Sequence, residues 1–90
     1  MRYEWDESKR AANLAKHGVD FHKAEQFEWI TAVEAKDNRF DYGEERWIAL
    51  GMIGNRLHVL IYTIRGDSIR LISLRRANPR EKEHYEQATT

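Results

Sequence analysis

The stretch from residue 45 to residue 76 constrains the fold more than any other part of the chain. It holds three runs of alternating or β-branched residues, at positions 45–52, 56–64 and 68–76. Two short segments that contain Gly54 and Gly66 separate the runs, and turns this short join antiparallel neighbours. The middle run is apolar on both faces, which predicts the central strand of a three-stranded antiparallel meander.

Helix signals flank this meander. Asp6 suits an N-cap and Gly18 a C-terminal stop, which predicts a first helix anchored by Leu14. Asp20 predicts the cap of a second short helix, over about residues 21–28. Residues 78–81 read Asn-Pro-Arg-Glu, which predicts a capping box that opens a last helix running to about residue 88.

The order of elements predicts an α+β fold. We expect a small antiparallel sheet with two N-terminal helices, one C-terminal helix and an additional edge strand over residues 3–5. A chain of 90 residues predicts one domain, residues 1–90. Since the chain has no cysteine and no apolar run of spanning length, we expect a cytoplasmic protein without disulfides and without membrane contact.

The zero net charge hides an uneven distribution. Residues 1–45 carry 7 basic and 11 acidic side chains, whereas residues 46–90 carry 8 basic and 4 acidic ones. Between positions 46 and 80 there are seven arginines, no lysine and one acid, Asp67. Arginine is the bidentate donor that suits phosphate, so the asymmetry indicates an anionic partner. The alternative is that these arginines pair with acids of the first half.

The densest cationic point is residues 75–80, where Arg75 and Arg76 end a strand and Arg80 falls in the first turn of the last helix. A helix start offers free N–H groups to an anion. Strand alternation sends Arg75 and Arg76 to opposite faces unless the strand twists or ends between them. We expect the guanidinium groups to converge beside the start of the last helix, and Arg46 and Arg65 can lie on the same rim.

Arginine binds phosphate and stabilises charge on it, but it does not act as a base. RNA carries its own nucleophile, the 2′-hydroxyl, so phosphate donors and an acid–base pair are sufficient for cleavage without a metal or other cofactor. The candidates for that pair are His17, His58, Glu81 and Tyr85. Each also has a purely structural interpretation. His17 can place a charge at a helix end and His58 can be a half-buried strand residue. Glu81 can be a capping partner and Tyr85 a packing residue. The four histidines are too dispersed to predict a zinc site.

Several blocks of the chain resemble one family. They are Tyr3-Glu4-Trp5-Asp6, Asn13 with Lys16-His17-Gly18-Val19, Leu50-Gly51, Thr63 with Arg65, and Arg70 with Ile72-Ser73 and Arg75-Arg76-Ala77, followed by Glu81 and Tyr85. In this order and spacing the chain is similar to the BrnT toxins of type II toxin–antitoxin systems. It departs from the usual family pattern at Leu74, where alanine is common.

The resemblance implies a RelE-like fold and a ribonuclease that cleaves RNA and inhibits translation. It also implies that a BrnA-type antitoxin with a ribbon-helix-helix part neutralises the toxin. Operator DNA would bind only through the toxin–antitoxin complex, and a dimer within that complex is left open. Arg65, Arg75 and Arg76 match the arginines expected to carry toxicity, and Lys16 and His17 match a shared motif. We therefore expect catalysis from Arg65, Arg75, Arg76, His17, Glu81 and Tyr85, and RNA binding by Arg46, Arg70, Arg80 and Lys16.

Two other functions remain open on the sequence. A helix-turn-helix reader would use Leu14, Gly18 and Phe21 as its turn, although the acidic first half is a poor surface for DNA. A docking module without activity would use the arginine surface to bind an acidic protein.

Overall fold

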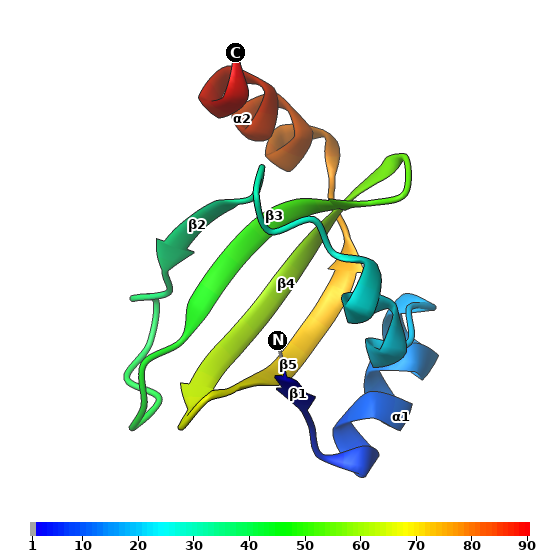
Figure 1. The fold of residues 1–90 in the computed structure, drawn as a ribbon, viewed down its shortest axis with the longest axis vertical. Helices are drawn as coiled ribbons and strands as arrows, with labels where there is room; N and C mark the ends of the chain where they lie inside the picture. The colour runs from blue at the N-terminus through cyan, green and yellow to red at the C-terminus, as the bar shows by residue number, and fades with distance from the viewer. Residues whose placement is uncertain (1) are drawn as a thin grey trace.

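The computed structural model describes residues 2–90 and shows a five-stranded mixed sheet in the order β1-β5-β4-β3-β2 (Figure 1). The strands are β1 (Arg2–Glu4), β2 (Val33–Lys36), β3 (Trp47–Ile53), β4 (Arg56–Arg65) and β5 (Ser68–Arg76). The helices are α1 (Glu7–His17), the 3₁₀ helix η1 (Phe21–Gln26) and α2 (Pro79–Thr89). Within residues 2–90, no helix combines the length and the apolar character that crossing a bilayer requires.

The structure is α+β and has an N-terminal edge strand, β1, but the predicted sheet, a three-stranded antiparallel meander with two N-terminal helices, is wrong. The meander β3-β4-β5 exists, with β4 at its centre, but β2 adds a further antiparallel strand to β3 and β1 pairs with β5 in parallel. The second N-terminal element is a 3₁₀ helix, and its two buried residues, Phe21 and Ala24, lie one 3₁₀ turn apart.

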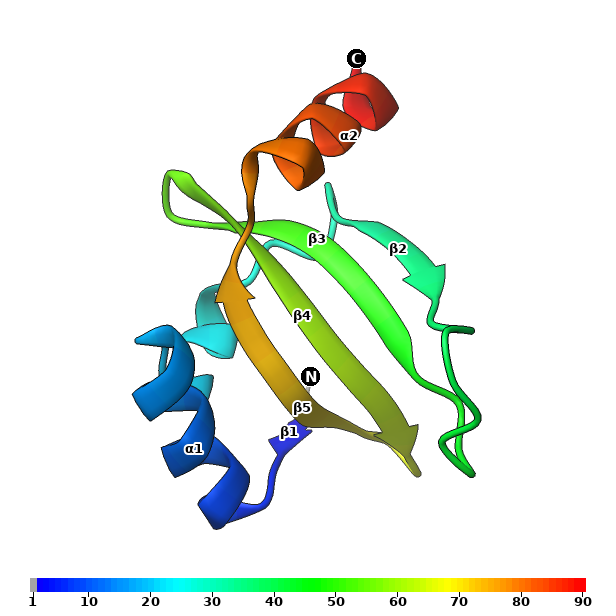
Figure 2. The ribbon, with the colours of Figure 1, turned by 180° about the vertical axis from the view of Figure 1, so that it is seen from behind.

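The two faces of the sheet have different cover. On one, which we call the core face, Leu60, Leu71 and Leu74 pack against Phe21 and Ala24 of η1. Figure 1 shows η1 in front of this face. The other, which we call the open face, has a smaller cluster that includes Leu50, Leu57, Val59 and Tyr85 of α2. Figure 2 shows this face from behind, with α2 beyond one end of the sheet and no helix across its middle.

A β-bulge in β5 decides which side chains face each way. Ile61 pairs with Ser73 but Tyr62 pairs with Leu71, so Ile72 is the additional residue of β5. As a result Leu71 and Leu74 both reach the core face although they are three positions apart. Arg75 pairs with Val59 on the open face, and Arg76 pairs with His58 on the core face.

Helix α1 is fixed to β5 by a buried amide. β1 pairs with β5 only over residues 68–70, so the rest of that edge lacks a neighbouring strand. The side chain of Asn13 takes the place of one: its Nδ2 donates to the carbonyl oxygens of Leu74 (2.8 Å) and Val19 (3.0 Å), and the N–H of Leu74 donates to its Oδ1 (3.2 Å). The predicted anchor Leu14 is 40% exposed, so that assignment is wrong.

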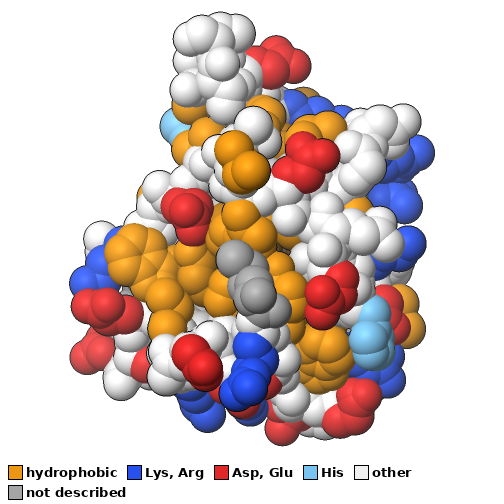
Figure 3. Space-filling model, viewed as in Figure 1, with side chains coloured by type: hydrophobic (Ala, Val, Ile, Leu, Met, Phe, Trp, Pro, Cys, Tyr) orange, Lys and Arg blue, Asp and Glu red, His pale blue; other side chains and the backbone are white. Residues whose placement is uncertain are grey.

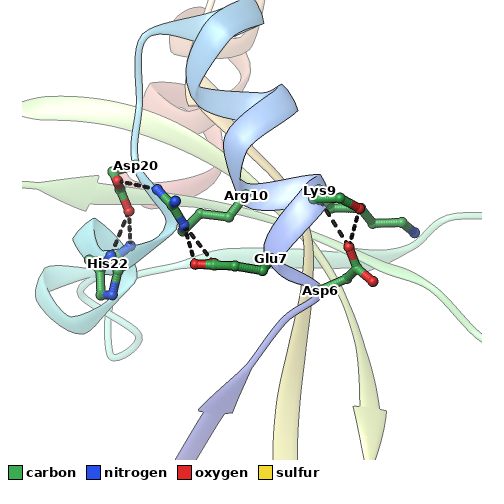
Figure 4. A network of polar contacts seen from close by, with 7 residues as sticks. Asp6, Glu7, Lys9, Arg10, Asp20 and His22 are labelled. Carbon is green, nitrogen blue, oxygen red and sulfur yellow. Dashed lines mark hydrogen bonds and ion pairs between the residues drawn. The ribbon is translucent and has the colours of Figure 1, made fainter.

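An ion-pair network joins α1 to η1 (Figure 4). Arg10 donates to Glu7 one turn earlier in the same helix (2.7 Å) and to Asp20 (3.0 Å), whose carboxylate also caps η1 by accepting from the N–H of His22 (2.9 Å). Asp6 caps α1, as predicted, and Gly18 ends it with φ of 71°. Both ends of α1 are therefore fixed, and so is the position of the residues in its last turn.

We predict that Asn13→Ala lowers the free energy of unfolding by about 1–3 kcal/mol, because it leaves the N–H and carbonyl of Leu74 buried without partners. Urea unfolding followed by circular dichroism measures the change. Leu14→Ala, one position away and partly exposed, is the matched control and is expected to shift stability by only about 0.5 kcal/mol. Equal losses in the two variants would contradict the role given to Asn13.

Candidate functional site

The start of α2 holds an arginine–carboxylate pair. Arg75, at the end of β5, donates from Nη2 to Oε2 of Glu81 (2.8 Å) and from Nη1 to Oε1 (2.9 Å). Glu81 also accepts from the N–H of Asn78 (2.8 Å), which completes the predicted capping box. These two bonds occupy one N–H on each of the terminal nitrogens, Nη1 and Nη2, of Arg75. Its Nε–H and one further N–H on Nη2, which share one edge, are left for another acceptor.

The pair fixes the charge of both groups. The hydrogen bonds from Arg75 lower the pKa of Glu81, more than burial raises it. The same bonds raise the pKa of Arg75. Glu81 is therefore an anion at neutral pH, and it orients Arg75 rather than supplying a proton.

His17 lies beside this pair, at the end of α1. It lines a groove of about 310 Å³ between α1 and β5, together with Lys9, Lys16 and Ser73. Burial lowers the pKa of His17, and the positive charges of Lys16 and Arg75 lower it further. The imidazole is thus mainly neutral at pH 7 and can accept a proton. Of the predicted residues, Lys16 and His17 line this groove, and the charge of Arg75, which is bound to Glu81, reaches His17.

Arg39 is a further cation that the sequence did not single out. It comes from the loop between β2 and β3, where Nε and Nη2 donate to the buried carboxylate of Asp37 at 2.8 and 2.9 Å. Its positive charge acts to lower the pKa of Arg75, which places the two guanidinium groups near each other. No local signal marks Arg39, since it falls in the acidic half of the chain and far from residue 75 in sequence.

Two of the predicted catalytic arginines lie elsewhere. Arg65 is exposed and pairs with Ser68, six residues along β4 from the partner of Arg75, which is about 20 Å at the rise of a strand. Arg76 is exposed on the core face, beside His58. The expected convergence of guanidinium groups beside the start of α2 is therefore wrong for Arg65. Arg76 lies near α2, in a cavity that Lys82 and Tyr85 also line, but on the opposite face of β5 from Arg75.

The other predicted residues are dispersed. Tyr85 packs on the open face and donates its hydroxyl to the carbonyl of Thr31 (3.1 Å). The guanidinium of Arg46 lies 4.0 Å from the ring centre of Tyr42, a cation–π contact. Arg70 reaches Glu4 at 3.4 Å, and Arg80 is exposed in the first turn of α2.

The arginines of the second half are mostly not neutralised. Of the seven between positions 46 and 80, Arg70 and Arg75 make ion pairs within residues 2–90, and only Arg70 reaches an acid of the first half. Their distribution is therefore poorly explained as a set of pairs with the acidic half. Five guanidinium groups therefore have no carboxylate partner within residues 2–90, and such cations suit an anionic ligand.

The helix-turn-helix alternative lacks its second helix. After Gly18 the chain forms the 3₁₀ helix η1, whose Phe21 and Ala24 are fully buried against the sheet. A reader of the major groove needs an α-helix with an exposed face at that position. In the part of the chain that the structure describes, no three side chains of His, Asp or Glu lie together as a metal site.

Comparison with known proteins identifies the family. A family model described as the ribonuclease toxin BrnT of type II toxin–antitoxin systems matches residues 5–81. The chain belongs to the BrnT family. The match to a ribonuclease toxin agrees with the arginines that lack carboxylate partners, and a type II system implies that this BrnT chain has a cognate antitoxin. No curated protein matches the chain.

The matched range covers most of the candidate residues of this BrnT protein. It runs from Trp5, just before α1, to Glu81 in the first turn of α2, and so contains the groove at His17 and the Arg75–Glu81 pair. Tyr85 and the rest of α2 lie beyond it.

We predict that Glu81→Gln lowers stability by about 1 kcal/mol at pH 7, and that this difference vanishes in acid. The pKa of Glu81 is lowered on folding, so its contribution is fully present above its unfolded value near 4.5 and is lost as the pH falls through the folded pKa. Thermal unfolding between pH 2.5 and pH 7 measures it. Glu83→Gln, an exposed position on the same helix, is the control. A difference that stays constant down to pH 2.5 would refute the role of the ion pair.

Proposed function

We propose that residues 1–90 act as a single toxin domain that cleaves RNA without a metal ion and thereby inhibits translation in the cytoplasm. Membership of a family of ribonuclease toxins supports the class of reaction. The observation that carries the proposal is that His17, on the groove between α1 and β5, lies close enough to Arg75 for the guanidinium charge to help keep the imidazole neutral. A proton acceptor and a phosphate donor are the two parts that cleavage by a 2′-hydroxyl requires.

In this mechanism the neutral imidazole of His17 takes the proton of the 2′-hydroxyl. The oxygen then attacks the neighbouring phosphorus, and the bond from phosphorus to the 5′-oxygen breaks. The 5′-oxygen takes a proton from solvent, which leaves a 2′,3′-cyclic phosphate and a 5′-hydroxyl. Arg75 donates from its free edge to the phosphoryl oxygens as their charge grows, and Glu81 holds the guanidinium in place.

We also propose that the cognate antitoxin is BrnA-like, with a ribbon-helix-helix part, and that operator DNA binds only through the complex, in which the toxin can be dimeric. The open face supports a protein partner, because partly buried apolar residues such as Ile48 and Ile61 form its floor and Arg75 lies at its margin. A segment with apolar and acidic side chains would complement both features.

We predict that the purified chain cleaves single-stranded RNA in the presence of EDTA and leaves the same sequence intact when its 2′-oxygens are methylated. Methylation removes the nucleophile but keeps the phosphates, so binding persists while cleavage stops. Gel analysis of the fragments, with detection of the cyclic phosphate, is the measurement. Loss of activity in EDTA, or cleavage of the methylated strand, would exclude this mechanism.

We predict that His17→Gln and Arg75→Ala each lower the rate of cleavage by about 100-fold, as expected for the loss of a base or of one transition-state donor. Both variants should also relieve growth arrest when the toxin is expressed. His84→Gln, an exposed histidine on α2, is the control and should cleave normally. Arg75→Lys keeps the charge but loses the two-pronged edge, so it should stay impaired. Full activity in His17→Gln would remove that residue from the mechanism.

A further inference from the structure

The core face has a hollow that the proposed mechanism does not use. It measures about 240 Å³ and lies between η1, the turn that joins β3 to β4, and the end of β5. Its charged and titratable lining residues are Lys23, Arg56, Arg76, Asp20 and His58. Figure 3 shows Lys and Arg side chains gathered at the margin of the molecule beside the β3–β4 turn.

The positive charges of this hollow are not neutralised. Within residues 2–90, neither Lys23, Arg56 nor Arg76 makes an ion pair. The one acid in the lining, Asp20, is already bound by Arg10 and by His22. Glu86 lines an adjoining cavity with Arg56 and Arg76 but, in the part of the chain that the structure describes, makes no ion pair with either. Three cations around one concave site, none of them bound to a carboxylate, attract an anion of phosphate size.

His58 adds a polar acceptor to these cations. Its Nδ1 lies 3.0 Å from the carbonyl oxygen of Arg56, and since a carbonyl only accepts, Nδ1 carries the proton and Nε2 is the free acceptor. The ring is neutral at pH 7, because burial first and then the charges of Arg76 and Arg56 lower the pKa of His58, outweighing that hydrogen bond. His58 is only 6% exposed but lines the hollow, and within residues 2–90 no protein group makes a hydrogen bond to its Nε2.

The hollow also adjoins the groove at His17. His17 lines the groove and Gly18, the next residue, lines the hollow. Likewise Arg75 faces the groove side of β5 and Arg76 the hollow side. Two pairs of consecutive residues therefore connect the two sites around the ends of α1 and β5, so one strand of nucleic acid can contact both.

We infer that the hollow is an RNA subsite that holds a phosphate between Lys23, Arg56 and Arg76 and accepts a hydrogen bond from the adjoining ribose 2′-hydroxyl at Nε2 of His58. The choice of RNA as its natural ligand rests on the proposed function. The chemistry itself needs a phosphate next to a hydroxyl, which ribonucleotides have and deoxyribonucleotides lack.

The test uses the full chain and three probes that cannot be cleaved: inorganic phosphate, adenosine 3′-monophosphate and its 2′-deoxy analogue. The ring resonances of His58 are followed by NMR at pH 7.5 during each titration. We expect them to shift with all three, and the ribonucleotide to bind about fivefold more tightly than the deoxy form, which lacks one hydrogen bond. The bound anion should also raise the pKa of His58, because it offsets the charges of Arg56, Arg76 and Lys23.

Arg56→Gln should weaken binding of the ribonucleotide by about tenfold, because it removes one charge-assisted donor from an exposed position. Arg2→Gln, an exposed arginine on β1, is the matched control and should bind normally. Thermal unfolding shows that both variants are folded.

Unmoved His58 resonances would overturn the subsite. Equal affinity for the two nucleotides would overturn the role of His58, and inorganic phosphate that binds as tightly as the ribonucleotide would overturn the assignment to RNA. These results differ from failure of the proposed function. If the chain binds the ribonucleotide in the hollow but cleaves no RNA in EDTA, the subsite stands and the proposed mechanism fails. If the chain cleaves RNA normally but binds nothing in the hollow, the mechanism stands and the subsite fails.

Discussion

The hydrogen bonds between the amide of Asn13 and the backbone of Leu74 determine where the first helix lies on the sheet. They substitute for a strand at the one stretch of β5 that β1 does not cover. His17 follows Asn13 by one helical turn, and Arg75 follows Leu74 directly, so the same contact brings the imidazole near the guanidinium. The Asn13 amide, which packs α1 against β5, therefore also determines the geometry of the proposed site.

The sequence predicted the elements that local chemistry specifies. The cap at Asp6, the stop at Gly18 and the capping box at Asn78 each depend on residues within one turn, and all three are present. The central place of β4 followed from its apolar residues on both faces. The strand β2 was not predicted because three of its four residues are exposed, so Val33–Lys36 has no hydrophobic alternation to detect. The parallel pairing of β1 depends on residues more than 60 positions away, which no local pattern records.

The candidate site was predictable only in part, for a related reason. Strand alternation correctly separated Arg75 from Arg76, but the bulge at Ile72 decided which face each one takes, and nothing in the residues around it announces a bulge. Tertiary structure likewise determines which arginines form ion pairs. Arg75 binds Glu81 across a strand–helix junction, and Arg70 binds Glu4 across a pair of strands. The close approach of Gly51 to Phe27 is of the same kind. A Cβ at Gly51 would lie 2.8 Å from Cε1 of that ring, a constraint that a lone glycine in a strand does not specify.

The placement of the arginines also explains why a chain of zero net charge can bind a polyanion. Carboxylates neutralise Arg70 and Arg75 locally, and in doing so they orient the Arg75 guanidinium with one edge free. Arg56 and Arg76 make no ion pair within residues 2–90, and both line the hollow on the core face. The unpaired guanidinium of Arg76 attracts an anion over a distance, whereas the paired guanidinium of Arg75 donates hydrogen bonds in a fixed direction. Consecutive residues of a strand point to opposite faces, so the end of β5 places the paired Arg75 on one face and the unpaired Arg76 on the other. The different roles of these two arginines therefore follow from the pleat of a single strand.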